Sequence, residues 1–138
     1  MRMSETLRDL ACQLQALIRR AAAKEGLTTT QAYVIFAVPV GGVPLSGLAN
    51  QLGLDASTIS RIINKMASRG WVERKPQPAD RRVIHVVLTS AGEAMYQLLA
   101  GHMDNSVENL MGDLDDLHQQ QLSQDLEDLS WRLLCQQT

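Results

Sequence analysis

The segment between residues 57 and 68 carries polar side chains at helical spacing, on the face opposite a stripe of isoleucine and methionine. Short hydroxyl side chains can approach base edges or phosphates closely, and arginine, asparagine and lysine can reach guanine, adenine or the sugar–phosphate backbone. The pattern therefore favours a helix that contacts nucleic acid, although an ordinary amphipathic surface helix has the same spacing. The candidate contact residues are Ser57, Thr58, Ser60, Arg61, Asn64 and Lys65.

Further basic residues follow directly. Arg74 lies in a β-rich run, residues 71–75, and a turn-forming stretch leads to a second β-rich run at 83–88. Arg81 and Arg82 stand at the end of that turn-forming stretch. The sequence therefore predicts a hairpin with a charged tip, and we expect all three arginines to extend the contact surface.

The charges of the chain are strongly segregated. The net charge is only −2, but residues 56–90 sum to +5 and residues 91–138 sum to −8. Affinity for phosphates depends on the local field rather than on the total charge, so the middle of the chain is the candidate surface for an anionic partner. A solvated basic face is the alternative.

Six segments have the apolar spacing of helices. The short helix predicted at residues 45–52 has Ser46 as its expected N-cap, and Asp55 or Ser57 is expected to cap the next helix. Thr28 with Gln31 fits a capping box. The apolar residues of the six segments lie within 7–21, 33–38, 45–52, 59–66, 91–111 and 122–133, and we expect Thr89 to cap the fifth helix and Asp115 to start the sixth.

Two of these helices are joined by a three-residue turn that contains Gly53. Such a pair is a helix-turn-helix, which places its second helix in the DNA major groove. The hairpin that follows supplies the second half of a winged helix. We therefore predict a mainly α-helical fold with a small β wing.

The segment DASTISRIINKMASRGWVERKPQPADRRVIHVVLTSAG, residues 55–92, resembles the MarR family of bacterial winged-helix regulators. LTTTQ at 27–31 and LSGLANQLGL at 45–54 match the same pattern in order and spacing. The D-x-R signature of the family at the wing is met by Asp80, Arg81 and Arg82.

The resemblance implies a winged helix-turn-helix head at residues 28–89 and dimerisation helices at 1–26 and 90–138. It implies a homodimer that reads a pseudo-palindromic operator in double-stranded DNA, with wing arginines in the minor groove and Asp80 holding the wing through an ion pair. It further implies a small ligand or oxidant that weakens DNA binding. The acidic C-terminal segment fits a body placed away from DNA.

A ligand cleft and a thiol switch are two further hypotheses. The expected cleft lies where the first, second and fifth helices meet the head, but residues of these types at helical spacing also fit an ordinary core. The candidate ligand residues are Arg19, Tyr33, Phe36, Met66 and Trp71. Cys12 and Cys135 could act in redox sensing, or could be inert thiols.

The sequence carries no mark of an enzyme. Gly42 and Gly47 have the spacing of a phosphate-binding loop but lack its lysine and hydroxyl residue, and the three histidines lie too far apart for a zinc motif. We expect neither a metal nor a cofactor. Because no apolar run is long enough to span a membrane and the N-terminus has no signal-peptide core, we expect a cytoplasmic protein with no membrane partner.

These features together favour a sequence-specific regulator of transcription, and more particularly a repressor, because a dimer bound at a promoter occludes it. Two alternatives remain open. The winged helix could instead be a protein-interaction module whose basic wing binds an acidic partner, or the chain could be a thiol-based redox-sensing regulator.

Overall fold

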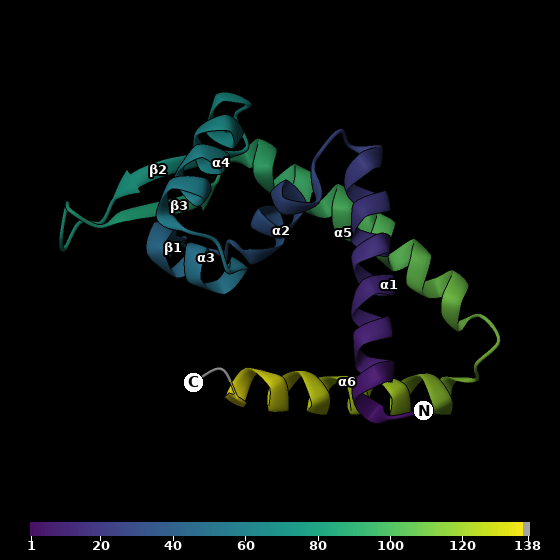
Figure 1. Ribbon diagram of the computed structural model, residues 1–138. Helices are drawn as coiled ribbons and strands as arrows, with labels where there is room; N and C mark the ends of the chain where they lie inside the picture. Colours follow the sequence, from purple (N-terminus) through teal and green to yellow (C-terminus); the bar gives the residue numbers. More distant parts are fainter. Residues whose placement is uncertain (137–138) are drawn as a thin grey trace. The chain divides into compact units, whose positions relative to one another are not determined.

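A computed structural model describes residues 1–136 as six helices and three short strands (Figure 1). Residues 1–103 pack into one unit, and a second, shorter unit begins at Asp104. The chain is mainly α-helical with a small antiparallel sheet, as predicted. The elements in chain order are α1 (Met3–Lys24), α2 (Thr29–Ala37), β1 (Val43–Pro44), α3 (Leu45–Leu52), α4 (Ala56–Ser68), β2 (Val72–Pro76), β3 (Ile84–Leu88), α5 (Ser90–Met111) and α6 (Asp116–Gln136).

The predicted caps are confirmed at four helix starts. The Gln31 N–H donates to Thr28 Oγ1 at 3.1 Å and the Thr28 N–H to Gln31 Oε1 at 3.0 Å, which completes the capping box of α2. Asp55 caps α4 and Thr89 accepts from an N–H in the first turn of α5. At the start of α6, the His118 N–H donates to Asp115 Oδ1 at 2.8 Å, and this bond is the main cause that lowers the pKa of Asp115.

The predicted N-cap of α3 is wrong. Pro44 occupies that position, and Ser46 is an exposed residue of the first turn with no capping role. The cause is β1, a strand that the sequence analysis missed: Val43 pairs with Val86 and Pro44 with His85. The pairing keeps the backbone extended up to Pro44, so the helix begins directly after it.

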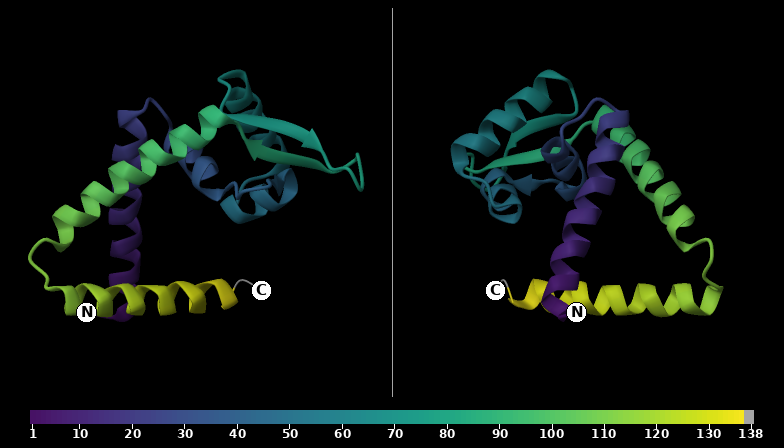
Figure 2. Two further views of the ribbon diagram at one scale, coloured as in Figure 1. Left: turned by 180° about the vertical axis from the view of Figure 1, so that it is seen from behind. Right: turned by 45° about the vertical axis from the view of Figure 1, so that its right-hand side comes forward.

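The strands form a sheet in the order β1-β3-β2, with both neighbouring pairs antiparallel. Strands β2 and β3, which are longer than β1, form the predicted hairpin, and this hairpin projects beyond α3 and α4 (Figure 2). Both strands begin one residue later than predicted. The Trp71 N–H closes the end of α4 on the Met66 carbonyl, and the Val83 N–H bonds the Asp80 carbonyl within the turn, so neither is available to start a strand.

The core of the first unit is formed where the helices cover one face of the sheet. Ile59, Ile63 and Met66 bury the inner side of α4, and Val72 and Val86 contribute from the strands. The turn between α3 and α4 depends on Gly53, whose φ of +66° is a left-handed conformation that favours glycine. Because the inner side of α4 is packed into the core, its outer side lies at the surface.

The second unit has little core of its own. None of the described residues of α6 is buried. Several large apolar side chains of α5 and α6 are exposed, including Leu117 at 72% and Trp131 at 64% of their full surface. No helix within residues 1–136 is long and apolar enough to cross a lipid bilayer.

Candidate nucleic-acid interface

The start of α4 is organised by Asp55. Its Oδ1 accepts from the Thr58 N–H at 2.7 Å and from the Ser57 hydroxyl at 2.9 Å. Hydrogen bonds from Thr58, side chain and backbone, and then from Ser57 hold the pKa of Asp55 below its ordinary value, and the charge of Arg61 adds to this effect. The Ser57 hydroxyl thus donates within the protein, and its lone pairs remain for an outside donor.

The middle of α4 presents the longer polar side chains. Arg61, Asn64 and Lys65 are all exposed, whereas Thr58 is half-buried. They share one surface because residues three and four apart lie on the same side of a helix. That surface is opposite the buried Ile59 and Ile63, as the sequence spacing predicts.

Arg74 and Ser60 are brought together in an unexpected way. Arg74 Nη2 donates to both the carbonyl and the hydroxyl oxygen of Ser60, each at 2.9 Å, and both residues are half-buried. The contact joins β2 to the middle of α4. Because one guanidinium nitrogen is committed to Ser60, the structure places Arg74 as a link between the hairpin and α4. A direct contact of Arg74 with DNA stays a prediction.

The tip of the hairpin is held by Asp80. Its Oδ1 accepts from the Arg82 N–H at 3.0 Å and from Arg82 Nε at 3.4 Å. The Arg82 side chain is nevertheless 94% exposed, and Arg81 is also exposed. Two cationic side chains therefore stand at the end of the hairpin, in reach of an anionic partner.

Arg69 is an exposed cation that the sequence analysis missed. The Arg69 guanidinium lies over the Trp71 ring, 5.4 Å from its centroid, a cation–π geometry at the C-terminal end of α4. Its position eight residues after Arg61 and four after Lys65 was the available signal. Arg69 extends the basic surface of α4 toward the start of β2.

The amino-acid sequence of this chain is similar to those of known regulators. The family model described as MarR family matches residues 25–83. The transcriptional repressor MprA of Escherichia coli is 31% identical over 88 residues, which are 64% of this chain and 50% of MprA. The uncharacterized HTH-type transcriptional regulator YwoH of Bacillus subtilis is 30% identical over 92 residues, 66% of each chain.

The chain belongs to the MarR family. The part of MprA that this chain matches is about half the length of MprA. The crystal structure of apo MarR from E. coli has the same fold, with a TM-score of 0.80 at 20% identity over 94% of this chain and 96% of that one. A cysteine-to-serine mutant of E. coli MarR complexed with operator DNA superposes with a TM-score of 0.70 at 21% identity, over 92% of each chain.

The ligand cleft expected in this MarR-family chain is not lined as predicted. Met66 is fully buried in the core, since it continues the apolar stripe of α4, and Trp71 lies under Arg69. Tyr33 is half-buried and Arg19 is exposed on α1, and neither lines a described cavity. A cavity of about 790 Å³ does lie between the end of α2, β3 and the first turns of α5. Of the predicted ligand residues it contains only Phe36, together with Val38, Val87, Leu88, Glu93 and Tyr96 among others.

The two cysteines of this MarR-family protein lie in different units. Cys12 is on α1 and Cys135 on α6, and both are exposed. Exposure makes both thiols accessible to an oxidant, but a redox role stays a prediction. Among residues 1–136, no three histidine, cysteine or acidic side chains are grouped so that they could hold a metal ion.

Proposed function

We propose that this protein is a sequence-specific DNA-binding regulator of transcription that acts in the bacterial cytoplasm. The observation that carries the proposal is the link between the two basic elements. Arg74 hydrogen-bonds Ser60, so the hairpin that carries the two arginines at its tip is joined through β2 to the middle of α4. A helix in the major groove and a wing on the neighbouring backbone need this fixed relation.

The side chains of α4 divide into two roles in this proposal. Arg61 and Asn64 have the geometry to pair with guanine and adenine edges, and Lys65 with Ser57 fits the phosphates. Arg81 and Arg82 of the wing enter the flanking minor groove, whose negative potential attracts arginine. The net charge of +5 over residues 56–90 supplies the attraction for the duplex.

We further propose that the regulator is a homodimer and a repressor. The exposed apolar side chains of α5 and α6 support a second copy as the partner, because a monomer would leave this surface in water. Two-fold symmetry would set the two copies of α4 about one turn of DNA apart, roughly 34 Å. The related MprA is named a transcriptional repressor, and a dimer on a promoter blocks it by occupancy.

We also propose that a small ligand lowers the affinity of the regulator for its operator. The cavity of about 790 Å³ supports it, since ligand pockets of drug-sized molecules have volumes of roughly 300–1,000 Å³. It lies between β3 of the winged helix and α5, two elements that a ligand could hold at a fixed spacing.

The experiment that tests the proposed function is a fluorescence anisotropy titration of the intact chain. The partners are DNA from upstream of its own gene, random duplex DNA and polyglutamate. We expect the upstream duplex to bind about 10³-fold more tightly than random DNA, with both affinities falling as salt rises. Polyglutamate that binds as tightly as any duplex would instead identify a protein-interaction module.

A further inference from the structure

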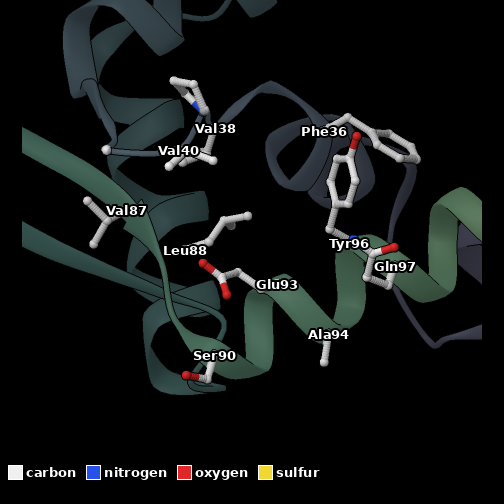
Figure 3. A pocket seen from close by; sticks show the side chains of 12 residues that line it. Phe36, Val38, Val40, Val87, Leu88, Ser90, Glu93, Ala94, Tyr96 and Gln97 are labelled. Atoms are coloured by element: carbon white, nitrogen blue, oxygen red, sulfur yellow. The ribbon is translucent and has the colours of Figure 1, made fainter.

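The cavity between α2, β3 and α5 has one charged side chain in its lining. Glu93 extends from the first turns of α5 toward Leu88, with the end of α2 and the loop that follows it on the other side (Figure 3). The remaining lining residues that the structure describes are apolar or neutral, with no lysine, arginine or histidine among them. The cavity therefore has a mixed apolar and polar lining with a single negative charge.

Aromatic rings form a second feature of the same cavity. Phe36 of α2 and Tyr96 of α5 meet edge to face, with ring centroids 5.7 Å apart and an interplanar angle of 78° (Figure 3). Tyr96 is exposed to 38% of its full surface, so part of its ring is available to a ligand. The face of an aromatic ring attracts cations, and proteins use aromatic rings in this way to bind quaternary ammonium groups.

From these two features we infer that the cavity is a binding site for a lipophilic organic cation. The side chains of Val38 and Val87 and the two rings would bury its hydrocarbon part, and Glu93 would neutralise its charge. An organic anion is disfavoured there, because it would meet the Glu93 carboxylate without any positive partner.

The position of Glu93 has a competing explanation. A carboxylate in the first turn of a helix is stabilised by the helix dipole, with no ligand involved. The dipole explains the charge of Glu93 but not its location in a cavity lined by aromatic rings. Only the cation site predicts that the charge of an added ligand changes its affinity.

The claim that the cation is the effector of a regulator rests on the proposed function. The claim that the cation binds in the cavity does not. We would therefore measure binding without DNA, by isothermal titration calorimetry on the intact chain. The probes are tetraphenylphosphonium and tetraphenylborate, which have nearly the same size and shape and opposite charges. The variants are Glu93→Gln and, as a control for the removal of negative charge, Glu108→Gln in the exposed later part of α5.

We expect tetraphenylphosphonium to bind wild type and Glu108→Gln alike, and Glu93→Gln about fivefold more weakly. Tetraphenylborate should bind wild type more weakly than the cation does. The inference fails if the two probes bind wild type equally well, a comparison that needs no variant to fold. It also fails if folded Glu93→Gln keeps the full affinity for the cation.

The same preparations separate this inference from the proposed function. Glu93 is not one of the residues assigned to DNA, so Glu93→Gln should bind the upstream duplex as wild type does. If the wild-type chain bound the cation but no DNA duplex, the proposed function would be wrong and the cation site would still be supported. DNA binding with no preference for the cation over the anion would do the reverse.

Discussion

Replacing Gly92 with alanine is expected to destabilise the protein by about 3 kcal/mol, a fall of the melting temperature of roughly 10 °C. Gly92 is a buried residue in the first turn of α5, and a Cβ there would lie 2.0 Å from the Trp71 carbonyl oxygen and 3.3 Å from Leu88 Cβ. The carbonyl cannot retreat freely, because it accepts the Thr89 N–H at 3.1 Å. The start of α5 must therefore move away from the segment that joins α4 to β2.

Gly101→Ala is the matched control for this substitution. Gly101 lies in the same helix, and a Cβ there would meet nothing within 4 Å. Alanine is the better helix former, so this variant should be more stable by about 0.5–1 kcal/mol. Thermal unfolding followed by circular dichroism measures both. If Gly92→Ala were stabilised like Gly101→Ala, α5 would not approach Trp71 as closely as the structure has it.

Replacing Arg61 with alanine should weaken binding to the operator by about 10- to 100-fold, the value of one good side-chain contact to a base. Arg82→Ala should weaken binding to all duplexes and reduce the salt dependence, by about one unit of slope for each phosphate that is no longer neutralised. Both side chains are exposed, so neither change should unfold the protein. Anisotropy titrations at several salt concentrations measure both effects.

Arg132→Ala is the control for the removal of positive charge. Arg132 is an exposed residue of α6 whose Nε pairs with Asp128 Oδ2 at 2.9 Å, outside the assigned interface. It should bind DNA like wild type. Equal affinities for all three variants would show that neither α4 nor the wing contacts the duplex.

The helices and their caps could be predicted from the sequence because their signals are local. The capping box of Thr28 and Gln31 and the cap at Asp55 each depend on residues within one turn. The strand at Val43 and Pro44 could not be predicted, because its two residues form a strand only through pairing with β3, about forty residues later. That missed strand also explains the misplaced N-cap at Ser46.

The exposed polar face of α4 follows from helical spacing alone, but its coupling to the hairpin does not. The bond from Arg74 to Ser60 joins residues fourteen apart, and nothing local indicates it. The cavity could be predicted from the sequence even less than this bond. Phe36, Val87 and Tyr96 come from three separate elements, so only the packed fold brings them together. The predicted ligand residue Met66 was drawn instead from the apolar stripe that forms the core.

Site-directed cleavage of DNA tests most directly whether the outer face of α4 lies in the groove. An iron chelate that generates hydroxyl radicals would be attached at Asn64→Cys, in a chain in which Cys12 and Cys135 are replaced by serine. Tethered there, it should cut the operator at two positions placed symmetrically about its centre, roughly one helical turn apart. The same chelate at Asp125→Cys on α6, a residue not assigned to the interface, serves as the control. Cleavage from Asn64→Cys that is as weak and unfocused as cleavage from Asp125→Cys would contradict the account.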